Sequence, residues 1–276
     1  MWGDYNTEEL ARPSQLFSAT SRSLHGFKGN YNIGNLQLTA IYGNGSEGFQ
    51  RDTIAPDGTS GFYFLSRRLL VSGSEEIYLE LEELNRPGTV LKRERLNRGT
   101  DYQIDYDRGT LRFQRPILRT DVDPQGQILT RRIVATYQFE SQGGDTHIFG
   151  GRAQYTFTRT LDRESWVGAT YFREDRGSQE FELYGADALV SLGENGRLIA
   201  EYAHSRNSLD FSEAVSGNAY RVELEGTVWE KVYGRAYWKT ADTGFSNNAT
   251  VSFVPGQTRY GAELRVDLSK NTSLRG

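Results

Sequence analysis

Residues 96–117, LNRGTDYQIDYDRGTLRFQRPI, place three carboxylates close together: Asp101, Asp105 and Asp107. Two neighbouring carboxylates can act as general acid and base when their surroundings separate their pKa values. In a strand, however, Asp101 and Asp105 would lie about 13 Å apart, whereas glycosidase carboxylates lie about 5 to 9.5 Å apart. The Asp-Arg-Gly that ends at Gly109 favours a tight turn, because glycine adopts positive φ at no steric cost. The sequence therefore predicts a β-hairpin here and no catalytic pair.

A second acidic stretch, DVDPQGQ, offers Asp121 and Asp123 as weak calcium ligands. The further oxygen ligands and the closing Glu of a calcium loop are missing, so a plain Pro-Gly turn is favoured. His25, His147 and His204 are scattered along the chain and do not form a ligand motif. Because no G-x-S-x-G, H-E-x-x-H or P-loop pattern occurs, we expect no enzyme, no catalytic residue, no cofactor and no metal.

Composition narrows the class of protein further. The 276 residues include 30 Gly, 6 Pro, no Cys and 12% aromatic residues, and the formal net charge is -4. No basic cluster marks a nucleic-acid interface. The absence of cysteine excludes a disulfide framework and a cysteine-based zinc site.

Alternation with a period of two dominates the chain and predicts strands with two different faces. The clearest cases are YRVELEGTV at 220–228 and YGAELRVDL at 260–268. Their apolar face consists of Tyr220, Val222, Leu224, Val228, Tyr260, Ala262, Leu264, Val266 and Leu268. Their charged face consists of Arg221, Glu223, Glu225, Glu263, Arg265 and Asp267.

Seven strands are expected after residue 147, near 148–158, 166–172, 181–192, 197–204, 219–229, 232–239 and 259–268. Short links alternate with long polar links at 173–180, 205–218 and 240–258. This arrangement is typical of outer-membrane barrels, whose strands are apolar toward lipid and polar toward the interior. The apolar residues above are therefore candidates for lipid contact, and the charged residues are candidates for lining the interior. Aromatic residues near strand ends suit an interfacial girdle: Trp166, Phe172, Trp229, Trp238 and Tyr260.

The chain before residue 145 divides into two parts. Residues 1–44 hold barrel strands, two of them joined at Gly34-Asn35, and residues 145–276 hold the seven later strands. Residues 45–144 are more charged and have strands of their own, near 75–84, 89–96, 101–106, 109–116 and 131–139. They suit a small β-sandwich inserted into the barrel.

The phrase GSEEIYLELEELNRPGTVLKRERLNRGTDYQIDYDRGTLRFQRPI, followed by RRIVATYQFE, resembles a module of long bacterial outer-membrane β-barrel surface proteins of the cyanobacterial type. Its RG-x-DY-x-IDY-x-x-G core is distantly similar to the barrel of the type 9 secretion translocon. WGDYNTEEL, RSLHGFKGNY and FVPGQTRYGAEL resemble strands of the same proteins. The resemblance implies a place in the bacterial outer membrane. Counting strands from the short turn at Gly34-Asn35 puts the inserted domain on the side of the long links, which is expected to be the outer face.

We therefore expect an all-β, antiparallel, partial outer-membrane β-barrel with an inserted β-sandwich. Its expected partners are outer-membrane lipid and the remaining strands of a longer barrel or a partner chain. Met1 is expected to be an internal or artificial start. The role would be structural, surface-binding or passive transport, with an unknown ligand. The alternative is a soluble, secreted all-β module that binds carbohydrate or protein.

Overall fold

The computed structural model is an all-β, antiparallel protein with a single described 3-10 helix, η1 (Glu8–Leu10). It describes residues 1–45, 47–84, 90–122, 126, 128–140, 146–160, 163–176, 179–193, 195–209, 213–229, 232–247, 253–269 and 272–276. Among these residues, no helix is both long and apolar enough to cross a membrane.

The chain forms two compact units. Unit 1 comprises residues 1–45, 147–250 and 254–276, and unit 2 comprises residues 46–146 and 251–253. The sequence placed the boundaries after residues 44 and 144.

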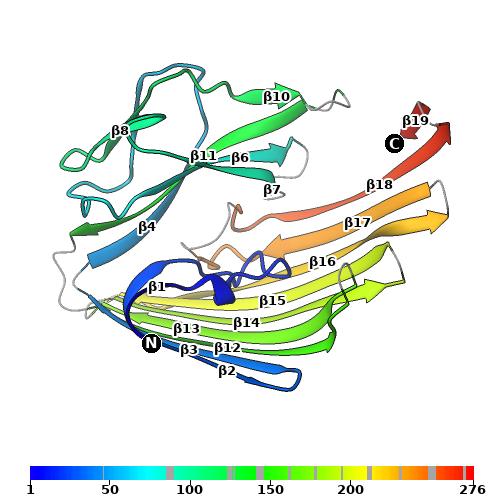
Figure 1. Ribbon diagram of the computed structural model, residues 1–276, viewed down its shortest axis with the longest axis horizontal. Helices are drawn as coiled ribbons and strands as arrows, with labels where there is room; N and C mark the ends of the chain where they lie inside the picture. Colours follow the sequence, from blue (N-terminus) through cyan, green and yellow to red (C-terminus); the bar gives the residue numbers. More distant parts are fainter. Residues whose placement is uncertain are drawn as a thin grey trace. The chain divides into compact units, whose positions relative to one another are not determined.

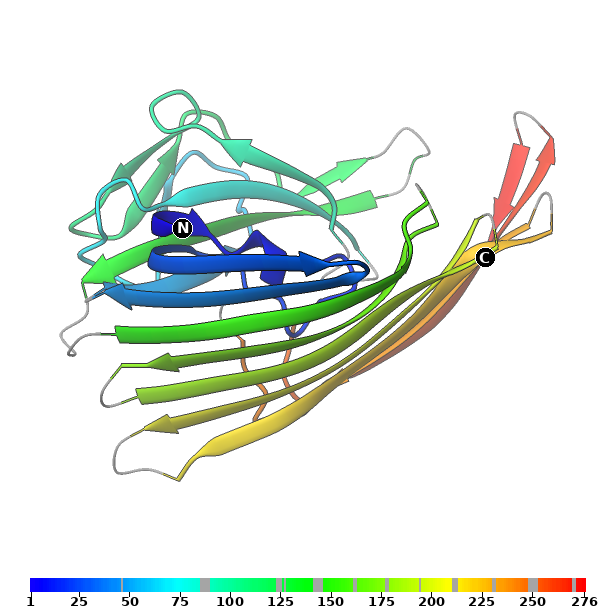
Figure 2. The ribbon, with the colours of Figure 1, turned by 60° about the horizontal axis from the view of Figure 1, so that its bottom comes forward.

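Unit 1 is built on one curved sheet of eleven strands (Figures 1 and 2). Its order is β1-β2-β3-β12-β13-β14-β15-β16-β17-β18-β19, so the strands follow one another in chain order, and β3 and β12 are neighbours in the sheet although unit 2 separates them in the chain. No described pairing joins the edge strands β1 and β19. The strands are β1 (Trp2–Asn6), β2 (Ser23–Ile33), β3 (Leu36–Gly45), β12 (Thr146–Thr158), β13 (Ser165–Asp175), β14 (Gln179–Leu192), β15 (Gly196–Leu209), β16 (Val215–Trp229), β17 (Val232–Ala241), β18 (Thr258–Ser269) and β19 (Thr272–Arg275).

Two of the three long links expected from the sequence are wrong. β13 ends at Asp175 and β14 begins at Gln179, and β15 and β16 also continue into the segment predicted as a loop. The reason is that polar residues remain paired across the strands there: Arg173 contacts Glu180 at 2.8 Å. The third link, residues 242–257, is long as expected. The polar residues at 173–180 and 205–218 lie largely within the strands, so they indicate a change in side-chain environment along the strands and do not mark where the strands end.

Unit 2 contains a five-stranded and a three-stranded antiparallel sheet. In the first, β11 pairs with β10, β6 and β4, and β6 pairs with β7; in the second, the order is β5-β9-β8. The sequence missed β4, β5 and β10. The strands are β4 (Glu47–Ile54), β5 (Phe62–Phe64), β6 (Glu76–Glu83), β7 (Val90–Leu96), β8 (Tyr102–Asp105), β9 (Thr110–Phe113), β10 (Thr120–Val122) and β11 (Ile128–Glu140).

The two sheets of unit 2 share one hydrophobic core, to which Ile77, Ile133, Leu111 and Phe113 contribute fully or almost fully buried side chains. The tyrosines of this core have partners for their hydroxyl groups. The Tyr137 hydroxyl donates to the Asp52 carboxylate at 2.6 Å. Burial, reinforced by this carboxylate, raises the pKa of Tyr137 above the usual tyrosine range.

We expect unit 2 to lose stability as the pH rises above 10, the ordinary pKa of tyrosine. Burial and the Glu75 carboxylate also raise the pKa of Tyr102. Below pH 10 both phenols are protonated whether folded or unfolded, so their contribution is complete. Above it only the unfolded phenols ionise, which costs up to about 1.4 kcal/mol per tyrosine for each pH unit.

Thermal unfolding followed by near-ultraviolet circular dichroism from about pH 8 to pH 11 measures this loss. Tyr137→Phe should flatten the alkaline slope, and Tyr260→Phe, at a highly exposed position, should leave it unchanged. An equal slope in both variants would show that the buried phenols do not cause the loss.

Candidate functional site

The large sheet has two chemically different faces. Residues 7–22, which link β1 to β2, lie within the curve of the sheet (Figure 1) and make hydrogen bonds with one face of it. We call this the inner face and the opposite side the outer face. Residues directly opposite each other in paired strands point to the same side, so the register assigns each side chain to one face.

The inner face is polar across its centre. One cross-strand row has small or polar side chains on seven strands and ends in three cations. In order from β12 to β18 it consists of Gln154, Gly168, Asp187, Glu201, Arg221, Lys239 and Arg259.

All six charged residues that the sequence proposed for the interior lie on the inner face. Glu223 is nearly buried between Arg221, at 2.8 Å, and Arg235, whose Nε lies 2.8 Å away. Glu225 contacts Arg235 at 3.5 Å and also pairs with Arg197. The other three follow on β18: Glu263 lies opposite Arg235, and Arg265 contacts Asp267 at 3.4 Å.

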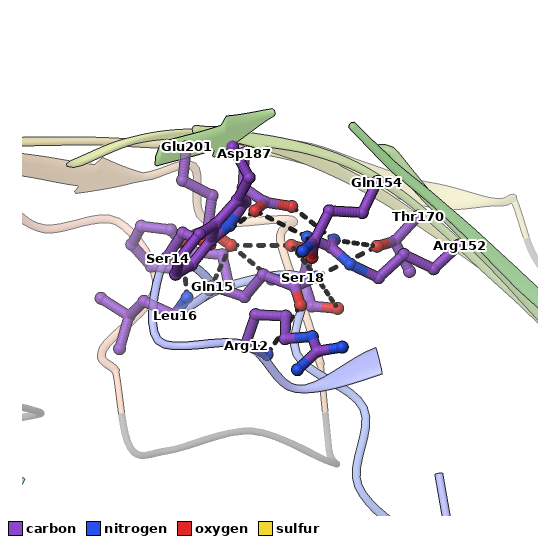
Figure 3. Close-up of polar contacts among 12 residues, drawn as sticks. Arg12, Ser14, Gln15, Leu16, Ser18, Arg152, Gln154, Thr170, Asp187 and Glu201 are labelled. Carbon is purple, nitrogen blue, oxygen red and sulfur yellow. Dashed lines mark hydrogen bonds and ion pairs between the residues drawn. The ribbon is translucent and has the colours of Figure 1, made fainter. Parts of the chain in front are cut away.

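Glu201 holds residues 7–22 against the inner face (Figure 3). Its carboxylate accepts hydrogen bonds from the backbone N–H groups of Leu16 at 2.7 Å, Phe17 at 2.9 Å and Ser18 at 2.8 Å. The Ser18 hydroxyl donates a fourth bond at 2.8 Å. Glu201 is 5% exposed and Ser18 is fully buried. Successive N–H groups that converge on one carboxylate form an anion-binding nest.

Asp187 is the second attachment point. Arg152 contacts both of its carboxylate oxygens, at 2.6 and 2.9 Å, and the Ser14 hydroxyl donates to it at 2.5 Å. Trp166 Nε1 donates to the same hydroxyl at 3.0 Å. The side chains of Arg152 and Asp187 are 2% and 0% exposed. Such bidentate, buried pairs are strong only while both partners are present.

Three further contacts fix the same segment. Phe17 packs edge-on against Phe245, with ring centroids 5.7 Å apart, and the Asn247 amide donates to the Phe17 carbonyl at 2.7 Å. At the end of the segment, Arg22 contacts Glu174 at 2.8 Å. Asp187 and Glu201 therefore both accept hydrogen bonds that hold residues 7–22 in place. Because both carboxylates are used in this way, the two are not arranged as an acid–base pair.

Sequence reasoning missed this cluster, although one signal was present. Asp187 and Glu201 each stand alone in an otherwise apolar or small run, YGADALV and LIAEYA. Each falls at an inner-face position of its strand, directly opposite the other. Lone carboxylates in such runs need a partner, which here is residues 7–22.

The outer face carries a belt of aromatic side chains. Ten strands, from β1 to β18 in the order of the sheet, each contribute one. Neighbouring rings contact each other, as in Tyr202 and Tyr220, with centroids 5.3 Å apart, and Tyr171 and Tyr184, with centroids 5.1 Å apart. The aromatic belt consists of Trp2, Phe27, Tyr42, Phe149, Tyr171, Tyr184, Tyr202, Tyr220, Trp238 and Tyr260.

The belt separates two chemical environments on the outer face. Toward the C-terminal ends of β12, β14 and β16, one row runs across five strands without a charge: Tyr155, Val167, Ala188, Ala200 and Val222. It meets the belt itself at Trp238. Toward the other ends of the strands, the outer positions become charged or polar, as with Arg173, Glu182 and Asn218. Val222, Leu224 and Leu264 on the apolar side are about half exposed.

Seven of the nine residues proposed for lipid contact fall at outer-face positions, as the register of β16, β17 and β18 shows. The side chains of Val228 and Leu268 lie outside the described part of the structure. Two members of the predicted girdle are wrong, because Trp166 and Phe172 are buried on the inner face. Successive residues of a strand point to opposite sides of the sheet, and the even-numbered residues of β13 point to the inner side. The side chain of Trp229 is not described either.

The acidic stretch of residues 96–117 forms the predicted hairpin. β8 and β9 pair from Tyr102 opposite Phe113 to Asp105 opposite Thr110, and Gly109 has φ +65°. Asp101 accepts a hydrogen bond from the Asn97 N–H at 2.8 Å. Asp105 accepts one from the Arg108 N–H at 3.0 Å. These two carboxylates cap local turns.

Of the two weak metal candidates, Asp121 contacts Arg131 at 2.5 Å, and Asp123 lies outside the described residues. Within the described residues, no three His, Asp or Glu side chains are grouped to hold an ion. The three histidines have separate partners: His25 contacts Asp4, His147 contacts Tyr42 and His204 contacts Asn218.

Comparison with known proteins adds no family to these observations. No family model matches the chain, and neither a curated protein nor a solved structure matches it.

Proposed function

We propose that the large sheet is the wall of a bacterial outer-membrane β-barrel, with its outer face toward lipid and its inner face lining a polar interior. The observation that carries this proposal is the aromatic belt, with an uncharged surface on one side of it and a charged surface on the other. Barrels place aromatic girdles where the lipid meets water and apolar side chains between them. A water-soluble sheet has no reason to sort its exposed face in this way.

The course of the belt supports the same proposal. From β12 to β18 the belt shifts by two residues at every second strand: Gly151, two residues beyond Phe149, lies opposite Tyr171, and Ala186, two beyond Tyr184, lies opposite Tyr202. The third shift, to Trp238, has the same direction. Two residues span about 6.6 Å and two strand spacings about 9.6 Å. A level belt therefore requires strands tilted by about 35°, which is within the range of membrane barrels.

The apolar surface also has a suitable height. On β14 it runs from Tyr184 to Leu192 in outward alternation. Eight residues of strand at that tilt span about 22 Å along the barrel axis, close to the apolar band of about 25 Å in outer-membrane barrels.

In this proposal the chain is not an enzyme. β1 and β19 pair with further strands of a longer barrel or of a partner chain, since open edges do not persist in lipid. Unit 2 is a β-sandwich inserted between neighbouring strands, and we place it at the outer surface, the side that the strand count predicts. The barrel serves a structural, surface-binding or passive-transport role.

One observation favours a binding role for unit 2. Phe62 and Phe64 on the edge strand β5 are 65% and 74% exposed and flank the buried Tyr63. Arg112 lies opposite Phe62 on the neighbouring strand. Exposed rings beside polar groups are suited to carbohydrate or protein ligands, and this surface would serve equally in a secreted module.

Tryptophan quenching by lipids with brominated acyl chains tests the lipid-facing surface. A W2F/W166F/W229F variant retains Trp238 on the outer face, and a W2F/W229F/W238F variant retains Trp166 on the inner face. We expect the first to be quenched strongly in vesicles and the second hardly at all.

Equal, weak quenching of both variants, together with a chain that remains in water without detergent, would overturn the barrel proposal in favour of the soluble module. Equal, strong quenching would contradict the assignment of the two faces.

A further inference from the structure

Residues 7–22 form a loop whose two ends are held side by side. The β1–β2 ladder ends with Asn6 opposite Ser23, and the Thr7 N–H donates to the Arg22 carbonyl at 3.0 Å, just beyond it. Because the loop is closed at its base by this ladder, it can leave the inner face as one piece without breaking a strand pair. Thr7 and Arg22 would then act as its hinge.

The contacts that hold the loop are made mostly by polar groups. Ser14 and Ser18 are fully buried and Gln15 is 7% exposed, yet each uses its side chain to contact the sheet. Gln15, for example, donates to Thr170 at 3.1 Å. Water can replace such contacts on both partners. The Arg152–Asp187 pair lies within the sheet and stays intact when the loop leaves.

Three large apolar side chains of the loop are buried: Leu10 fully, and Leu16 and Phe17 nearly so. Phe17 rests against Phe245 in the link between β17 and β18. The remaining attachment is concentrated on one group, since Glu201 alone accepts four of the hydrogen bonds. Hydrogen bonds to a charged acceptor are roughly twice as strong as neutral ones.

We propose that residues 7–22 are a displaceable plug and that Glu201 is the group that holds it closed. Displacement exposes the polar row of the inner face, including Asp187, Arg221 and Lys239, to water and small hydrophilic solutes. The inference deepens the proposed function and rests on it, because this row lines a passage only if the outer face lies in lipid. The plug then regulates that passage.

Thiol labelling tests the plug directly, because the native chain contains no cysteine. Ser18→Cys places a single thiol in the buried loop, and a water-soluble maleimide reaches it only when the loop leaves the sheet. We expect Glu201→Gln in this background to raise the labelling rate at least about tenfold, since an amide NH₂ cannot accept a hydrogen bond and the three backbone N–H donors of residues 16–18 lose one of their two acceptor oxygens.

Glu223→Gln is the matched control. It removes the charge of another nearly buried inner-face carboxylate, whose contacts in the structure are Arg221 and Arg235, so labelling should not change. If Glu201→Gln leaves the rate unchanged, or if Glu223→Gln raises it equally, Glu201 does not hold the plug.

Hydrogen exchange of the unmodified chain gives a second measurement that needs no variant. The amides of residues 16–18 should exchange faster than those of β14 and β15, because the loop opens without global unfolding. Exchange at the rate of the β14–β15 ladder would overturn displacement. Neither measurement depends on lipid, so failure of the plug and failure of the barrel, tested by Trp238 quenching, remain distinct.

Discussion

Leu224→Arg is expected to impair membrane insertion severely. Leu224 lies on the apolar surface four residues beyond the belt residue Tyr220, opposite Leu198 and Ala236 on the adjacent strands. In the proposed barrel this position faces acyl chains, where an Arg costs about 2 to 4 kcal/mol near the bilayer midplane. Equilibrium urea unfolding of the chain in lipid vesicles measures this cost.

Ser216→Arg provides a control on the same strand. Ser216 is exposed on the outer face beyond the aromatic belt, opposite Arg206, and an Arg at the interface costs only about 0 to 1 kcal/mol. If both variants cost the same small amount, the outer face meets water, as it would in a secreted module.

Asp187→Ala should reduce the free energy of unfolding by about 3 to 5 kcal/mol, the effect of removing one partner of a buried ion pair. The Arg152 guanidinium, with its side chain 2% exposed, would lose both of its carboxylate contacts. Ser14 would lose its acceptor as well. Chemical denaturation of the full chain measures the change.

Two further variants separate this mechanism from a general sensitivity to mutation. Asp267→Ala removes an acid from a partly exposed pair with Arg265, and such pairs contribute at most about 1 kcal/mol. The double variant R152M/D187L removes both charges and should recover much of the loss, because matched apolar pairs can replace buried ion pairs. A large loss that the double variant does not recover would contradict the ion-pair explanation.

The faces of the strands could be predicted because alternation is a local property. Each residue of YRVELEGTV takes the opposite side from its neighbour, so the sequence alone separates Val222 from Glu223. Closeness to a strand end, in contrast, does not decide the face: Trp166 and Phe172 lie on the inner face, whereas Trp238 and Tyr260 lie on the outer face. Strand lengths were also misjudged, since Arg173 and Glu180 extend a strand through a contact across the sheet.

The contacts of residues 7–22 could not be derived from local pattern. Leu16 and Glu201 are separated by 185 residues, and Ser14 and Asp187 by 173. Nothing within either segment specifies its partner, because Ser, Gln and Leu are equally compatible with an exposed loop. Only the fold brings a group of N–H donors to a lone carboxylate.

The position of unit 2 has an evolutionary consequence. β3 and β12, which border unit 2 in the chain, are neighbours in the sheet. A turn of a few residues could therefore join them in place of residues 46–146. A recombination event could therefore add, remove or exchange a whole domain at this position without altering a single pairing of the sheet. Related chains can be expected to share the same strands and to differ in what they carry between these two.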